Sequence, residues 1–194
     1  MLVAFQACGR LPPRDIDDLC AIFAEREPWR EAAATAFERW KVPEPVQLAL
    51  LHQESRFRSE ARPGWRRVLW VIPAGRLSSA YGYGQVKDGT WSDYLKHAGP
   101  SGARRDSFAD TVDFVGWYAS VIHRVTGIEP HDAFNLYLAY HEGPAGYSRG
   151  SYREKEWLVG VARKVEARSS LYAAQFATCG GPPWPPPPPP PEGG

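Results

Sequence analysis

The sequence of 194 residues lacks a charge imbalance, a long apolar run and any extended alternation of apolar and polar residues. Its 23 Lys and Arg stand against 22 Asp and Glu, whereas a dedicated nucleic-acid-binding domain normally carries a marked basic excess. No stretch reaches the length of about eighteen apolar residues that spans a bilayer. No period-2 pattern longer than about five residues indicates a β-rich fold. We therefore expect one mostly helical domain with short tails and no nucleic-acid partner.

Signatures of metal and cofactor sites are also missing. None of the three cysteines has the spacing of metal ligands. His141-Glu142 begins like a zinc-protease box, but the second histidine of that box is absent. Gly82-Tyr83-Gly84 is not followed by the third glycine of a dinucleotide-binding loop. We expect neither a metal ion nor an organic cofactor.

Aromatic residues, in contrast, are abundant, with eight Trp and nine Tyr. Two interpretations are open at this point. The rings can form a stacking surface for a flat ligand such as a sugar ring, or they can fill a tryptophan-rich core.

Apolar residues that recur at intervals of three and four predict helices along most of the chain. In the clearest helix, from Asp106 to Thr126, Gly127 provides the stop signal. The segment from Pro45 to Phe57 is apolar almost all round, which is typical of a buried central helix. The other expected helices lie near 15–23, 28–40, 131–142 and 154–177. The last of these is expected to bury Trp157, Val161, Val165, Tyr172 and Phe176.

Only one segment, Val68–Ile72, has strong β propensity, and it lies in a loop-like stretch. No internal repeat is visible. The architecture is therefore expected to be mainly α, with one irregular insert that can form a β-hairpin.

The two ends differ from the middle in composition. Residues 1–14 are interpreted as a leader and linker, because the sequence before Cys8 looks like the end of a bacterial lipoprotein signal, although Gln6 fits such a signal poorly. We expect Cys8 to carry lipid; a frayed tail with an incidental thiol is the alternative. Residues 181–194 form a proline-rich tail that cannot join a helix or sheet. It can be a stiff spacer, a ligand for a protein partner, or a tail without function.

If Cys8 carries lipid, Cys20 and Cys179 remain as a pair flanking the folded region. A bridge between them would close a loop of 159 residues (179 − 20). In the chain-entropy model this cross-link stabilises the fold by about 5 kcal/mol. Such a disulfide requires an oxidising compartment.

Glu54 lies in the last turn of the most apolar expected helix. Burial disfavours its charged form, and so does the partial negative charge at a helix C-terminus. A carboxyl that keeps its proton near neutral pH can serve as a general acid. The alternative is an exposed glutamate where the helix meets solvent.

Three blocks, Glu54–Phe57, Ala80–Gln85 and Ala139–Pro144, resemble in this order the lytic transglycosylases of the SLT type. These relatives of goose-type lysozyme cleave the glycan strands of peptidoglycan. The resemblance covers roughly Trp29 to Arg163 and implies a lysozyme-like catalytic domain, which we place at residues 15–180. It also implies a periplasmic protein that the lipid on Cys8 would anchor to the outer membrane.

Carried over to this chain, the resemblance makes Glu54 the single acid/base. The substrate-binding residues that it implies are Ser55, Tyr81, Gln85, Tyr140 and Glu142, with Tyr140 hydrogen-bonding near Glu54 and the sugar. The implied reaction cleaves the bond between N-acetylmuramic acid and N-acetylglucosamine and closes a 1,6-anhydro ring, without a second carboxylate. Two alternatives remain open. One is a non-catalytic peptidoglycan-binding module. The other is a muramidase that uses water and a second carboxylate, for which the candidates are Asp88, Asp93, Asp113 and Glu142.

The chain departs from the family pattern at two points. The asparagine that usually follows the family's tyrosine is His141 here, and Glu142 comes next, which places two ionisable groups close to the proposed acid. The 31 residues from Glu54 to Gln85 (85 − 54) are more than the family pattern leads us to expect. This extra sequence can form a basic, aromatic lip that grips the glycan, or a hairpin whose tryptophans cover the core. Its relevant residues are Trp65, Arg66, Arg67, Trp70 and Arg76.

Overall fold

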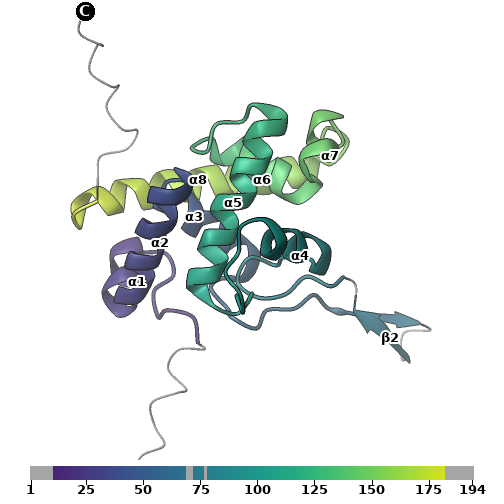
Figure 1. Ribbon diagram of the computed structural model, residues 1–194, viewed down its shortest axis with the longest axis horizontal. Coiled ribbons are helices and arrows are strands. Elements are labelled where there is room, and N and C mark those ends of the chain that lie inside the picture. Colours follow the sequence, from purple (N-terminus) through teal and green to yellow (C-terminus); the bar gives the residue numbers. More distant parts are fainter. Residues whose placement is uncertain (1–10, 69–71, 77, 182–194) are drawn as a thin grey trace, which may run out of the picture.

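The computed structural model describes residues 11–68, 72–76 and 78–181. The predicted lipidation at Cys8 and nearly all of the proline-rich tail lie outside these ranges. The side chains of the predicted lip at 65–76 also lie outside the described part of the structure. Within that part the fold is mainly α, as predicted, with eight helices and one two-stranded hairpin (Figure 1).

The six expected helices are confirmed to within a few residues, and two further helices, α4 and the short α7, were not anticipated from the sequence. The helices are α1 (Leu19–Glu25), α2 (Glu27–Trp40), α3 (Glu44–Ser55), α4 (Asp88–His97), α5 (Phe108–Thr126), α6 (Ala133–Glu142), α7 (Pro144–Ser148) and α8 (Glu156–Thr178). None of the helices in the described ranges is long and apolar enough to cross a membrane.

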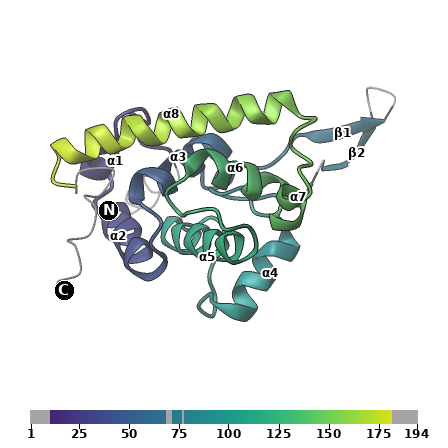
Figure 2. The same ribbon diagram turned by 90° about the horizontal axis from the view of Figure 1, so that it is seen from above.

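Helix α3 is the centre of the fold, as its apolar sequence predicts. Its residues 44–51 are buried, and it packs between α8 and the pair formed by α2 and α5 (Figure 2). Only His52, Gln53 and Glu54 in its last turn are partly open to solvent. The helix therefore carries a polar end out of an apolar core.

Helix α3 ends two residues earlier than predicted, because Arg56 and Phe57 both adopt left-handed backbone conformations, with φ of 52° and 58°. Such conformations strain residues other than glycine by about 1 kcal/mol or more. The buried ring of Phe57, 5.8 Å from that of Trp29, offsets this cost by packing. The turn holds Glu54 at the surface end of the central helix.

The insert forms a β-hairpin, but its strands are not where the β-propensity predicts. Strand β1 (Trp65–Val68) pairs antiparallel with β2 (Ile72–Arg76), and Val68 lies opposite Ile72. The predicted strand Val68–Ile72 is therefore not a single strand, since its two ends belong to different strands. Its apolar run contains the connection between them.

The predicted disulfide is present. Cys20 of α1 is bonded to Cys179 just after α8, with 5.9 Å between their Cα atoms. The Tyr172 hydroxyl also donates a hydrogen bond to the carbonyl of Ile16. These links tie the first helical segment to the end of the last helix.

One predicted core residue is not in the core. Trp157 in the first turn of α8 is 59% exposed, whereas Val165, Tyr172 and Phe176 of the same helix are buried. The first turn of α8 is packed, since Leu158 is fully buried, but Trp157 lies on the face of this turn that is open to solvent. The prediction of burial at this position was wrong.

Candidate active site

A cavity of about 450 Å³ opens beside Glu54. Its wall combines the end of α3, the loop before α4, the start of α4, the middle of α5 and the end of α6. Phe114, Tyr118 and Tyr140 supply an aromatic side, with the rings of Tyr118 and Tyr140 5.5 Å apart. The remaining lining residues are Ser78, Ala80, Gln85, Val86, Lys87, Thr90, His141, Glu142 and Gly143.

Glu54 is the only carboxyl in this cavity wall without an ion-pair partner among the described residues. Burial raises its pKa from 4.5 to about 7, because the ionised form loses solvation. A hydrogen bond from the Tyr137 hydroxyl opposes this effect in part. The carboxyl therefore holds a proton up to neutral pH, and its role as a general acid stays a prediction.

Tyr137 is a site residue that the sequence analysis did not single out. It is buried in α6, and both burial and the nearby carboxyl raise the pKa of its hydroxyl, so the phenol stays a donor. Its position three residues before Tyr140 places the two phenols on one helical face. That spacing was the available signal, but only the packing of α6 reveals which phenol reaches Glu54.

Tyr140 lines the cavity, but its hydroxyl donates to the backbone carbonyl of Gly84 at 2.8 Å. Burial, followed by the neighbouring Glu54, raises the pKa of this phenol well above its usual value. The predicted role of Tyr140 close to Glu54 and the sugar stays a prediction. The hydrogen bond shown by the structure links α6 to the loop that carries Gln85.

This loop, Gly82–Gln85, is shaped by close backbone packing. Gly82 has φ of 81°, and a Cβ there would lie 1.9 Å from the carbonyl oxygen of Arg105, so no larger residue fits. The Gln85 side-chain amide donates to the carbonyls of Ala61 and Gly82, each at 2.9 Å. Gln85 thus holds two loops together while it lines the cavity.

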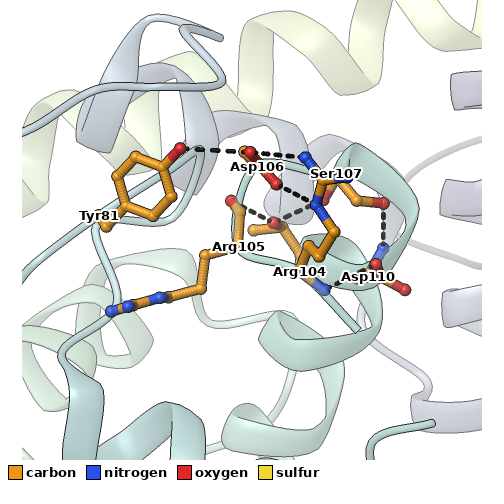
Figure 3. Close-up of polar contacts among 7 residues, drawn as sticks. Tyr81, Arg104, Arg105, Asp106, Ser107 and Asp110 are labelled. Carbon is orange, nitrogen blue, oxygen red and sulfur yellow. Dashed lines mark hydrogen bonds and ion pairs between the residues drawn. The ribbon is translucent and has the colours of Figure 1, made fainter. Parts of the chain in front are cut away.

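Tyr81, a predicted substrate-binding residue, does not line the cavity, and its hydroxyl points toward Asp106 (Figure 3). Its hydroxyl donates to Asp106 at 3.2 Å, and Arg104 holds the same carboxylate from the other side. The guanidinium groups of Arg62 and Arg105 lie 4.1 and 5.5 Å from the Tyr81 ring centre. These contacts connect the Gly82–Gln85 loop to the segment before α5.

Ser55, also a predicted substrate-binding residue, is 2% exposed and does not line the cavity. Its hydroxyl donates to the carbonyl of Leu51 at 3.3 Å, within its own helix. In this geometry Ser55 stabilises the last turn of α3, directly behind Glu54.

Glu142 lines the cavity as an ionised carboxylate whose oxygens are held by hydrogen bonds. Lys155 donates to both of its carboxylate oxygens at 2.7 and 2.8 Å, and the Ser151 hydroxyl donates to one of them. These bonds, with that from Lys155 the strongest, lower the pKa of Glu142 to about 2. The side chain is only 5% exposed.

The other candidate carboxylates lie elsewhere. Asp113 accepts hydrogen bonds from Arg39, Trp40 and Tyr94, which joins α2, α4 and α5. Asp88 pairs with Arg105 at 2.8 Å. Neither these two nor Asp93 line the cavity beside Glu54. Across the described ranges, His, Cys, Asp and Glu nowhere form a group of three suited to a metal ion.

A family model described as transglycosylase SLT domain matches residues 1–179, which includes every residue of the cavity. No match was found among curated proteins.

Proposed function

Because this chain belongs to the transglycosylase SLT domain family, whose members degrade peptidoglycan, we propose that it is a lytic transglycosylase with Glu54 as its single acid/base. The proposed substrate bond joins N-acetylmuramic acid to N-acetylglucosamine. The observation that carries the proposal is a carboxyl with a pKa of about 7, placed on the wall of a cavity with an aromatic side.

In the proposed reaction the Glu54 carboxyl donates its proton to the glycosidic oxygen as that bond breaks. The acetamido oxygen of the muramyl residue stabilises the cation at the anomeric carbon. The Glu54 carboxylate then takes the proton of the C6 hydroxyl, whose oxygen closes the 1,6-anhydro ring. A pKa near 7 suits both steps, because the same group must give a proton and then accept one.

The state of Glu142 supports this mechanism over hydrolysis. An inverting muramidase needs a second carboxylate that activates water. Glu142 is the other carboxylate of the cavity wall, but Lys155 and Ser151 occupy its oxygens and its pKa is about 2. A group of such low basicity is a poor general base at neutral pH. Muramidase activity is therefore the second candidate, and Glu142 is the only residue of this wall besides Glu54 that could supply the second carboxylate.

Mass spectrometry of the products from purified peptidoglycan tests the proposal. Wild-type protein should release 1,6-anhydromuramyl ends, and Glu54→Gln, which keeps the side-chain shape, should release none. Circular dichroism should show the same fold for both proteins. Reducing muramyl ends would refute the transglycosylase and favour the muramidase. No cleavage by folded wild-type protein would leave a binding module.

We further propose that the protein is a periplasmic lipoprotein held at the outer membrane through Cys8, with a proline-rich tail available to a protein partner. The Cys20–Cys179 disulfide supports an oxidising compartment. Intact-mass analysis of protein isolated from its native cells tests the anchor. A diacylglyceryl mass on Cys8 is expected, and a free Cys8 thiol would refute it.

A further inference from the structure

Trp157 is unusual among the tryptophans of this chain. Of those whose side chains the structure describes, it alone is exposed, at 59%. Tryptophan is seldom left so open to solvent, because burying its large ring is favourable. An exposed indole beside a ligand cavity is typical of a binding surface. The other described tryptophans, which are buried or half-buried, are Trp29, Trp40, Trp91 and Trp117.

The Trp157 ring lies against the rim of the Glu54 cavity. Its centre is 5.3 Å from that of His141, and the two rings meet at 80° in an edge-to-face contact. His141 itself lines the cavity and is 38% exposed. Helix α8 packs against α6, and Lys155, which precedes α8, is bonded to Glu142 at the end of α6. Trp157 therefore continues the cavity wall outward.

An ion pair between Glu142 and Lys155 links the two segments that carry these rings. Glu142 follows His141 in α6, and Lys155 precedes Trp157 by two residues, so their bonds of 2.7 and 2.8 Å join the two ring-bearing segments. His141 Nδ1 also lies 3.1 Å from Glu142. The charges of this pair balance each other. The surface is thus preformed, and it suits a flat ligand with an apolar face and neutral polar edges.

We propose that Trp157 and His141 form a binding platform for a sugar ring of the glycan strand outside the catalytic cavity. The C–H face of an N-acetylhexosamine stacks on the indole, and the imidazole hydrogen-bonds to a sugar hydroxyl or acetamido group. This inference rests on the proposed function, because the strand must pass from the cavity over its rim. It predicts that the enzyme prefers long strands to short ones.

Equilibrium binding in the inactive Glu54→Gln background tests the platform without requiring cleavage. The ligands are uncrosslinked peptidoglycan glycan strands, either long or cut to a tetrasaccharide, measured by calorimetry. Adding Trp157→Ala should weaken binding of the long strands about 3- to 10-fold, from the loss of one stacking contact. The tetrasaccharide, which has fewer sugar rings to extend beyond the cavity, should be affected less. Val125→Ala, another exposed apolar residue outside the cavity lining, should leave both affinities unchanged.

Trp157→Phe should retain most of the affinity, because a smaller ring still stacks. Equal binding of long strands with and without Trp157 would overturn the inference. An equal loss for both ligands, together with a fall in Tm, would mean a structural role and would also overturn it. If wild-type protein failed to cleave peptidoglycan while the length-dependent loss persisted, the proposed reaction would be refuted and the platform would stand.

Discussion

Replacing Glu54 by glutamine should stabilise the fold, and the gain should grow with pH. In the folded chain the pKa of Glu54 is about 7, compared with 4.5 for the unperturbed group. Between these two values the unfolded chain has released the proton while the folded chain still binds it. Wild-type stability therefore falls as pH rises from 4.5 to 7 and changes no further, through this group, above pH 7. Glutamine has no such titration.

The size of the effect follows from the two pKa values. A difference between about 7 and 4.5 corresponds to about 3 kcal/mol. Solvent that enters the open cavity screens part of this penalty, so we expect a gain of about 2–3 kcal/mol. The gain refers to the difference between Glu54→Gln and wild type at pH 7.5, measured relative to their difference at pH 4.

Urea unfolding of wild type and Glu54→Gln across this pH range, with the disulfide intact, measures the gain directly. Glu142→Gln is the matched control. The folded-state pKa of Glu142 is about 2, so its stabilising contribution is lost only as pH falls from 4.5 toward 2. Between pH 5 and 7.5 the titration of Glu142 itself should add little slope to the difference from wild type, because this carboxyl is mostly ionised in both the folded and the unfolded chain. Parallel stability curves for wild type and Glu54→Gln would show that the folded chain does not raise the pKa of Glu54.

Three other predictions concern the surroundings of Glu54 and the frame of the fold. Tyr137→Phe removes the hydrogen bond that lowers the pKa of Glu54, so the alkaline limb of the kcat/KM profile, expected near pH 7, should move to higher pH; an unmoved limb would contradict the contact. Gly82→Ala should lower stability by about 1–3 kcal/mol and abolish cleavage, because its Cβ meets a backbone carbonyl. The control Gly89→Ala, which has open space around it, should keep both the stability and the cleavage activity in the same thermal melts and product assays. Removing the Cys20–Cys179 disulfide by double serine substitution should cost up to about 5 kcal/mol in urea unfolding, and a much smaller loss would mean that the reduced, unfolded chain is already compact.

Much of the frame could be predicted from the sequence, because the helices depend on local periodicity. The apolar residues of α3 predict a buried helix wherever the chain places it, and Glu54 in its last turn is then forced to the boundary between core and solvent. The stop at Gly127 likewise needs only local backbone chemistry, since the residue adopts φ of 74°. The hairpin was harder to locate, because its apolar run spans the connection between the strands.

The contacts within the site follow from tertiary packing. The sequence spacing places Tyr137 and Tyr140 on the same face of α6 and does not tell which of them reaches Glu54. The packing of α6 against α3 and the Gly82–Gln85 loop brings the Tyr137 hydroxyl to Glu54 and the Tyr140 hydroxyl to Gly84. The sequence does not show that Glu142 has a partner. In the structure Lys155, which lies 13 residues further along the chain, forms an ion pair with it.

By itself, then, the sequence determined the helical frame, the acid at the end of the buried helix and the pair of cysteines that closes the fold. Only the tertiary structure decided which phenol holds the acid, which carboxylate is locked in an ion pair and that Trp157 faces solvent. The physical reason is the distance along the chain between the residues that interact. Helix formation depends on neighbours three and four residues apart, whereas hydrogen-bond partners and exposure depend on segments that only folding brings together.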